Sequence, residues 1–324
     1  MWASIALRNV IGGISGRRWL PVFAMGSGLL MGLFLSYARG VVFNEVKAPD
    51  TVFKKPPEVI RFVTFNVAHG RGLALYQGLV DRDSIQSNLE ELGEYLRRLD
   101  ADVVGLQEID QDCDWSGNIN QLKVIAREAG YPYHRFGVNN RNGGDYRLFY
   151  GNAILSKHPI VEFENHPFGD APVAEKGFLV ADVDAGGRTV TCVVTHLDPI
   201  RESERKKQLA RMVQVVEGRD NPVVVMGDFN CELEEESPIK TLCQELGLQI
   251  PTPNEKDRDT YWQLLNKTID FVFASDGIEY ENYRVGEAKL SDHYPVIADL
   301  VLEKTEEKDV PSDDKPLAEV APEK

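Results

Sequence analysis

Four separate apolar segments end in side chains that could bind a metal ion or transfer a proton. Carboxylate and amide oxygens are the ligands that Mg²⁺ prefers, and Asp and His side chains can act as general acids or bases. The sequence has six His and no HExxH motif, which disfavours a zinc hydrolase. The residues at these segment ends are Asn66, Glu108, Asp228, Asn230, Asp292 and His293.

Short strands are the elements that must carry these side chains. Asp228 and Asn230 are two positions apart, so in an extended segment both could reach one point. Hairpins, such as one turning at Gly186-Gly187, alternate with strand–helix–strand units. This mixture predicts an α+β protein with two mixed β-sheets and helices outside them. The apolar runs predict strands at 60–66, 101–108, 151–156, 177–183, 189–196, 222–226, 268–274 and 296–301.

Three amphipathic segments predict the helices between these strands. The first has Ser84 as its expected N-cap and apolar residues spaced by three or four positions up to Leu99. The second begins near Ser203. The third opens at Ser237-Pro238, a capping residue followed by proline in the first turn.

The two ends of the chain differ from its body. Residues 19–38 are uncharged and long enough for a transmembrane helix, and the Arg residues before them predict that 1–18 is cytoplasmic. A secretory signal cleaved after Ala38 is the alternative. Residues 39–58 are expected to be a linker, 59–302 the domain and 303–324 a disordered acidic tail. Both interpretations place the domain outside the cytoplasm, either tethered to the cell membrane or secreted or periplasmic.

The charge of the body limits its partners. The 324-residue chain has a net charge of −15, and residues 51–302 contain 27 basic and 41 acidic residues. Such a body is poorly suited to charge-driven binding of nucleic acid, which makes nucleic acid a disfavoured partner.

Seven motifs together resemble the endonuclease/exonuclease/phosphatase superfamily, which has the deoxyribonuclease I-like fold. They occur in family order across residues 60–302, and GDFN and SDHYPV are the most specific. The resemblance implies a four-layer α/β/β/α sandwich with its site at one end, between the two sheets. The motifs are FNVAHGRG (65–72), LQEID (106–110), YGNAILSKHPI (150–160), VTHLD (194–198), VMGDFN (225–230), KTIDFVFAS (267–275) and LSDHYPV (290–296).

The resemblance also implies roles for single residues. Asn66 and Glu108 would hold Mg²⁺, or Mn²⁺ as a substitute, with Asp292 associated with the metal. Asp228 would orient or deprotonate the attacking water, and Asn230 would bind a metal or the scissile phosphate.

The remaining implied roles concern proton transfer and substrate contacts. His293 would be essential and Asp270 would orient it, while His196 would donate to the phosphate or the leaving group. For Asn152, a site-facing role in substrate binding and a structural hydrogen bond are both open. His69 and Arg71 could contact a substrate phosphate or lie in a solvated loop.

These observations predict an exported, divalent-metal-dependent hydrolase of phosphoric esters. A membrane tether favours a lipid head group or a small phosphodiester as substrate. A secreted or tethered nuclease is the alternative. A catalytically inactive binding module is a further alternative, but none of the expected site residues is missing.

Overall fold

The computed structural model describes residues 58–169, 175–185, 188–252, 259–263 and 266–302. These residues form two six-stranded sheets. The first sheet has the order β11-β12-β1-β2-β4-β3, and the pair β1–β2 is parallel while its other pairs are antiparallel. Its strands are β1 (Val59–Asn66), β2 (Val103–Cys113), β3 (Tyr133–Gly143), β4 (Arg147–Ser156), β11 (Ile278–Val285) and β12 (Val296–Leu302).

The second sheet has the order β5-β6-β7-β8-β10-β9, and its one parallel pair is β7–β8. Both β1 and β8 lie in the interiors of their sheets, and each has one parallel and one antiparallel neighbour. The strands are β5 (Ile160–Pro167), β6 (Gly177–Asp184), β7 (Thr189–His196), β8 (Val223–Asp228), β9 (Leu248–Gln249) and β10 (Asp270–Ser275).

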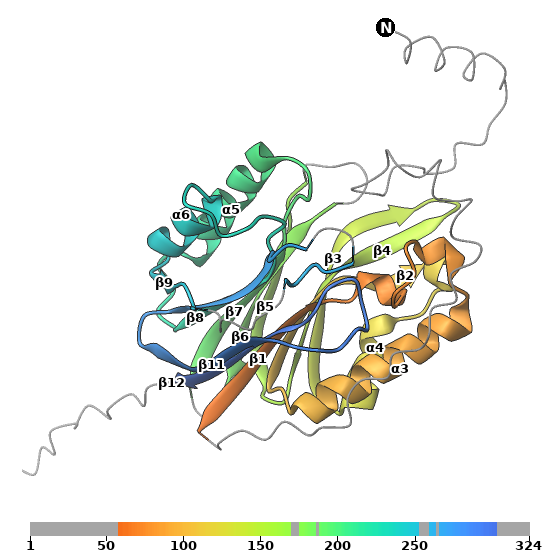
Figure 1. Cartoon of the computed structure of the whole chain (residues 1–324), viewed down its shortest axis with the longest axis horizontal. Coiled ribbons are helices and arrows are strands. Elements are labelled where there is room, and N and C mark those ends of the chain that lie inside the picture. Colours follow the sequence, from red (N-terminus) through yellow and green to blue (C-terminus); the bar gives the residue numbers. More distant parts are fainter. Residues whose placement is uncertain (1–57, 170–174, 186–187, 253–258, 264–265, 303–324) are drawn as a thin grey trace, which may run out of the picture.

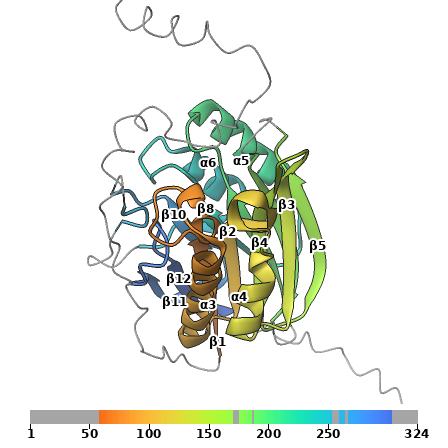
Figure 2. The ribbon, with the colours of Figure 1, turned by 90° about the vertical axis from the view of Figure 1, so that its right-hand side faces the viewer.

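Helices cover the outer face of each sheet, as Figure 1 shows. Three hydrophobic clusters fill the spaces between the layers: one under α3 and α4, one between the sheets, and one under α5 and α6. Figure 2 shows α3 and α4 lying over β1, β2 and β4 from the side. The predicted four-layer sandwich is therefore confirmed. The helices are α3 (Arg82–Leu99), α4 (Gln121–Ala129), α5 (Glu202–Val216) and α6 (Pro238–Glu245), with 3₁₀ turns η2 (Ala68–Gly70), η3 (Gln77–Leu79) and η4 (Asp114–Ser116).

Two local predictions are wrong. The first helix is capped by Asp81 and not by Ser84, because the Asp81 carboxylate accepts the backbone N–H of Ser84, which lies one turn into the helix. The second predicted strand does not end at Glu108 but continues to Cys113 through a bulge.

Several predictions lie outside the described residues. These are the segments 1–18 and 19–38, almost all of the linker 39–58, the tail 303–324 and the turn at Gly186-Gly187. Among the described residues, none of the helices combines the length and the apolar character needed to cross a bilayer.

Candidate active site

Three of the predicted site residues lie side by side across the second sheet. Asp228 ends β8, and in the register of the sheet it stands opposite His196 on β7 and Asp270 on β10. Neighbouring residues in register project to the same face of a sheet, so the three side chains form one row. All three are at most 3% exposed. A Cβ at Gly227 would collide with the Thr195 carbonyl oxygen, so glycine is needed where β8 approaches β7.

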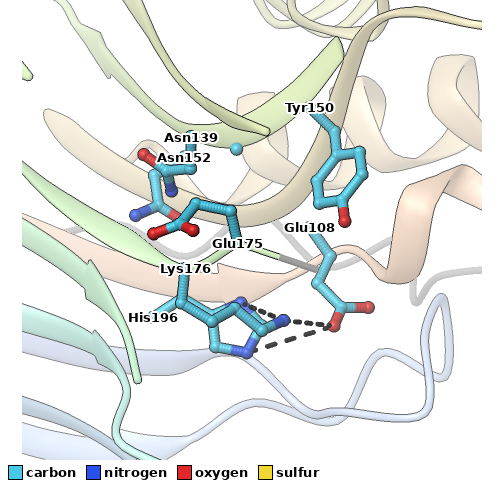
Figure 3. Close-up of a pocket in the computed structure, with 8 residues that line it drawn as sticks. Glu108, Asn139, Tyr150, Asn152, Glu175, Lys176 and His196 are labelled. Atoms are coloured by element: carbon cyan, nitrogen blue, oxygen red, sulfur yellow. Dashed lines mark hydrogen bonds and ion pairs between the residues drawn. The ribbon is translucent and has the colours of Figure 1, made fainter. Parts of the chain in front are cut away.

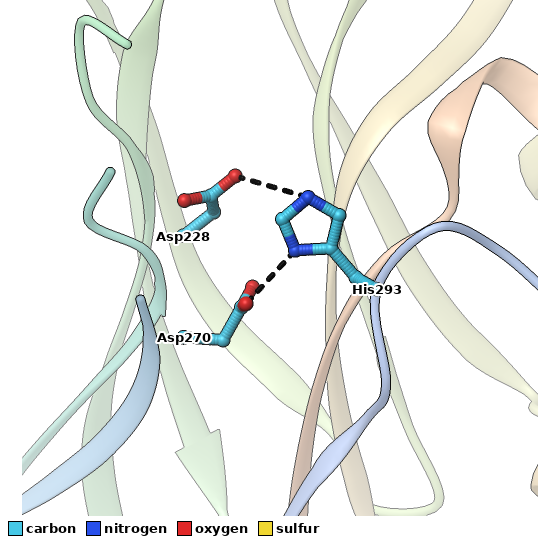
Figure 4. Close-up of side chains that lie close together, drawn as sticks. All are labelled: Asp228, Asp270 and His293. Carbon is cyan, nitrogen blue, oxygen red and sulfur yellow. Dashed lines mark hydrogen bonds and ion pairs between the residues drawn. The ribbon is translucent and has the colours of Figure 1, made fainter. Parts of the chain in front are cut away.

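His293 reaches this row from the segment that precedes β12 of the first sheet. Its Nδ1 lies 2.8 Å from Asp270 Oδ2, and its Nε2 lies 3.9 Å from Asp228 Oδ2, as Figure 4 shows. Burial disfavours a charged imidazole, but the surrounding carboxylates, Asp270 first, outweigh burial and raise the pKa of His293 to about 10. His293 is therefore an imidazolium at neutral pH, with Nε2–H directed toward Asp228.

Asp228 contacts side chains from several strands at once. Its Oδ2 accepts a hydrogen bond of 3.0 Å from Asn66 Nδ2 and lies 3.4 Å from His196 Nε2. Burial, followed by the negative charge of Asp270, raises the pKa of Asp228 to about 7. A carboxylate with this pKa can accept and release a proton near neutral pH.

His196 is flanked on its other side by a lysine ammonium. Lys176 Nζ lies 3.3 Å from His196 Nδ1 and 3.4 Å from Glu108 Oε1, as Figure 3 shows. Burial, together with the charge of Lys176, holds the pKa of His196 well below its usual range. Because an ammonium only donates, Nδ1 accepts its hydrogen and the neutral ring carries its proton on Nε2, toward Asp228.

Glu108 is turned into the site by a β-bulge. Gln107 and Glu108 together face the single residue Asn152 of β4, and Glu108 has a φ of 50°. Partial burial would raise the pKa of Glu108. The nearby cations, Lys176 first, hold it well below its usual range. Glu108 is therefore an ionised ligand at any physiological pH.

The predicted metal ligands make different contacts with their neighbours. Arg71 lies 3.7 Å from Glu108 Oε2 and 2.5 Å from Asp292 Oδ2, so one guanidinium bridges these two carboxylates. Asn66 instead donates to Asp228, and its Oδ1 accepts the backbone N–H of Ala68. Carboxylate and amide oxygens are the donor set that a hard dication needs, and in this structure the positive charges of Arg71 and Lys176 balance the carboxylates of Glu108 and Asp292. The residues therefore fit a divalent metal.

A tight cluster of Asp228, Asp270 and His293 also offers one ligand atom each within 4.8 Å. Hydrogen bonding already occupies part of this cluster. His293 Nδ1 is already hydrogen-bonded to Asp270, which leaves only Nε2, and Nε2 faces Asp228.

Asn230 does not take the position that the sequence predicts, in which its side chain and that of Asp228 reach one point. β8 ends at Asp228, and Asn230 has a left-handed backbone with φ 51°. Its amide donates to the Leu197 carbonyl, and only its backbone N–H contacts Asp228, so the prediction that both side chains reach one point from an extended segment is wrong. Asn152 donates 2.8 Å to the Gly177 carbonyl, which is the structural hydrogen bond.

Asn152 also faces the site. Its Oδ1 is buried without a partner in the described part of the chain, and the residue lines a small cavity together with Glu108, Lys176 and His196. With a volume of about 10 Å³, the cavity has room for about one water. Figure 3 shows these side chains around it.

Sequence reasoning missed Lys176 and assigned no role to Asp110. Lys176 directly precedes β6, and a single lysine before a strand carries no spacing signal. Asp110 belongs to the LQEID motif but points to His69, whose role was left open. His69 is buried rather than solvated because the loop that follows β1 places it inside the protein.

Comparison with known proteins supports the fold. An alignment over 153 residues, which covers 44% of this chain, shows 33% identity to the uncharacterised protein YbhP of Escherichia coli K12 and covers 58% of that relative's length. The endonuclease/exonuclease/phosphatase from Bacteroides vulgatus shares the fold, with a TM-score of 0.59, 18% identity and coverage of 76% of this chain and 99% of that one.

Sphingomyelinase C from Streptomyces griseocarneus also shares the fold. Its TM-score is 0.54 and its identity 20%, with coverage of 74% of this chain and 99% of that one. A model of the endonuclease/exonuclease/phosphatase family matches residues 63–293, which include every predicted site residue. This chain belongs to the endonuclease/exonuclease/phosphatase family.

Proposed function

We propose that the protein hydrolyses phosphodiester bonds with the help of a divalent metal ion. The observation that carries this proposal is the position of Asp228 between the Nε2 atoms of His196 and His293, at 3.4 and 3.9 Å. A carboxylate that titrates near pH 7 lies between two groups whose N–H bonds point at it. This arrangement suits an attacking water at Asp228 and a phosphoryl oxygen at the imidazoles.

Each side chain then has a defined task. Asp228 accepts a proton from the attacking water. His293, held as an imidazolium by Asp270, donates Nε2–H to the negative charge that develops on the phosphoryl oxygens. The neutral His196 donates a hydrogen bond from Nε2–H to the phosphate or the leaving oxygen, and Lys176 keeps the ring in that tautomer.

The metal would be held by Glu108 with Asn66 and Asp292. Arg71 would have to release its contact with Asp292, whereas Asn66 Oδ1 has a second lone pair and can keep the Ala68 backbone N–H. When bound, a divalent ion acts as a Lewis acid that polarises the phosphoryl group. We propose Mg²⁺, with Mn²⁺ as a substitute.

For the substrate, we propose a lipid head group or another small phosphodiester, acted on outside the cytoplasm. The support is the uncharged segment 19–38, the acidic body and the fold shared with a sphingomyelinase C. The proposed location is the cell membrane, with secretion or the periplasm as the alternative.

The test is an assay of the purified full chain in detergent micelles with Mg²⁺ or Mn²⁺. Sphingomyelin, phosphatidylinositol and plasmid DNA are offered separately, and Asp228→Asn serves as the blank. Lipid turnover that is absent in the blank supports the proposal. DNA nicking with the same dependence would make the protein a nuclease, and no turnover with any substrate or metal would leave an inactive binding module.

A further inference from the structure

A second His–Asp pair lies on the other side of Glu108, outside the residues assigned above. We propose that His69 binds the divalent metal through Nε2, beside Glu108, in a carboxylate–imidazole–metal arrangement with Asp110. The proposal rests on the metal dependence of the proposed function and adds a nitrogen ligand to a site otherwise made of oxygens.

The backbone places His69 firmly inside the protein. The residue is 6% exposed and belongs to η2, the turn that directly follows β1. Ala68 and His69 have φ values of 49° and 55°, which non-glycine residues rarely adopt. The turn is held by the hydrogen bond from the Ala68 backbone N–H to Asn66 Oδ1 and by Gln121, which donates to the His69 carbonyl at 2.7 Å. Such an enforced geometry is typical of functional sites.

Asp110 determines which ring nitrogen of His69 carries the proton. Asp110 is fully buried, and its Oδ2 accepts hydrogen bonds from Trp115 Nε1 at 2.7 Å and Ser116 Oγ at 2.6 Å. Its Oδ1 lies 2.7 Å from His69 Nδ1. Because the indole can only donate, Asp110 acts as an acceptor, and His69 Nδ1 supplies the proton to it. The lone pair of a neutral His69 is therefore on Nε2.

That lone pair faces a carboxylate. His69 Nε2 lies 3.6 Å from Glu108 Oε2, while the edges of Trp115 and Tyr150 hold the imidazole ring at centroid distances of 4.9 and 5.1 Å. A single cation between Nε2 and Oε2 would contact both atoms. Two atoms that each bind one cation at about 2.1 Å lie at most about 4 Å apart, which includes this separation.

The arrangement matches the way proteins orient metal-binding histidines. Such a histidine almost always donates its other ring N–H to a carboxylate or carbonyl, which fixes the tautomer and the ring orientation. Asp110 fills this role for His69. Arg71 lies 3.7 Å from the same Glu108 oxygen and would move away from Asp292 when the metal binds.

A nitrogen ligand changes the metal preference. Mg²⁺ prefers oxygen ligands, whereas an imidazole ligand favours first-row transition dications, of which Mn²⁺ is the weakest binder. We therefore expect the protein to bind Mn²⁺ more tightly than Mg²⁺, and we expect His69 to be responsible for the difference.

The test measures binding and not turnover. The full chain in detergent is stripped with a chelator, free Mn²⁺ is followed by electron paramagnetic resonance, and Mg²⁺ is titrated as a competitor. In His69→Gln, the Kd for Mn²⁺ should rise about 10–100-fold while the Kd for Mg²⁺ changes less than about threefold. His158→Gln is the matched control, because His158 follows the far end of β4, and it should leave both values unchanged.

Two results would overturn the proposal: no Mn²⁺ binding by the native chain, or a Kd for Mn²⁺ in His69→Gln within about twofold of the native value. Asp110→Asn should weaken Mn²⁺ binding in the same range, provided that its circular dichroism spectrum is native. A chain that binds Mn²⁺ through His69 but hydrolyses no phosphoester would contradict the proposed function alone. A chain that hydrolyses lipid but keeps its Mn²⁺ affinity in His69→Gln would contradict this inference alone.

Discussion

Two His–Asp pairs flank the site, and their surroundings differ. In the first, His293 contacts Asp270 at 2.8 Å; in the second, His69 contacts Asp110 at 2.7 Å. Asp270 has one carboxylate oxygen that is buried without a partner among the described residues. Asp110 shares its charge among His69, Trp115, Ser116 and Gln121.

In our proposals, this difference separates a proton donor, His293, from a metal ligand, His69. The unshared charge of Asp270, with Asp228 and Asp292 nearby, keeps His293 protonated. The charge of Asp110 is spread over several donors, so it mainly fixes the orientation and tautomer of His69. The same two residue types can therefore serve different chemistry, depending on what else binds the carboxylate.

The largest loss of activity is expected from substitution of Asp228, whose Oδ2 lies opposite His293 Nε2. Asp228→Asn removes the group that accepts the water proton, so kcat should fall about 10³-fold, equivalent to about 4 kcal/mol. Steady-state hydrolysis of the phosphoester that the native chain turns over measures this loss. The midpoint of thermal unfolding should not fall, because the substitution also removes the repulsion between Asp228 and Asp270. A kcat within tenfold of the native value would contradict the assignment.

The free energy of unfolding should depend more on the Asp110 carboxylate than on that of Asp112. Asp110→Ala leaves several buried donors without an acceptor, so the free energy of unfolding should fall by about 3 kcal/mol. Asp112→Ala is the control, because that carboxylate is partly exposed and pairs with Arg147 on the surface; a change below about 1 kcal/mol is expected. Urea unfolding followed by circular dichroism gives both values. Equal losses of unfolding free energy would mean that the buried donors around Asp110 do not depend on its carboxylate.

A smaller loss of activity is expected when the His293–Asp270 pair is broken. Asp270→Asn keeps the volume but removes the charge that holds His293 as an imidazolium, so kcat should fall about 10²-fold. Mn²⁺ affinity should stay within about twofold, because His293 binds no metal in our assignment. A large loss of Mn²⁺ affinity would instead favour a metal at the cluster of Asp228, Asp270 and His293.

The smallest effect is a shift in the pH profile. In the native chain, kcat/KM should rise with pH until about 7, as Asp228 loses its proton, and fall near pH 10, as His293 loses its own. In Asp270→Asn, the alkaline fall should move to lower pH, because the carboxylate that raises the pKa of His293 is gone. An unchanged alkaline limb would show that another group controls it.

The eight strands predicted from apolar runs are the interior strands of the two sheets. The described strands without a prediction, β3, β5, β9 and β11, are the four sheet edges. Edge strands such as β5 and β11 expose alternate side chains, so they lack the continuous apolar run that marks a strand buried on both faces. The helix α4 is only nine residues long and was also missed.

Local patterns by themselves determined the interior strands, the family and most of the polar residues at the site, because burial and motif spacing are written along the chain. Tertiary structure alone decided which groups face one another. The register of β7, β8 and β10 aligns His196, Asp228 and Asp270, a bulge turns Glu108 inward, and Asp110 orients the His69 ring beside Glu108. These contacts join residues far apart in the sequence, and hydrogen-bond competition within the folded site sets their protonation, which no local pattern encodes.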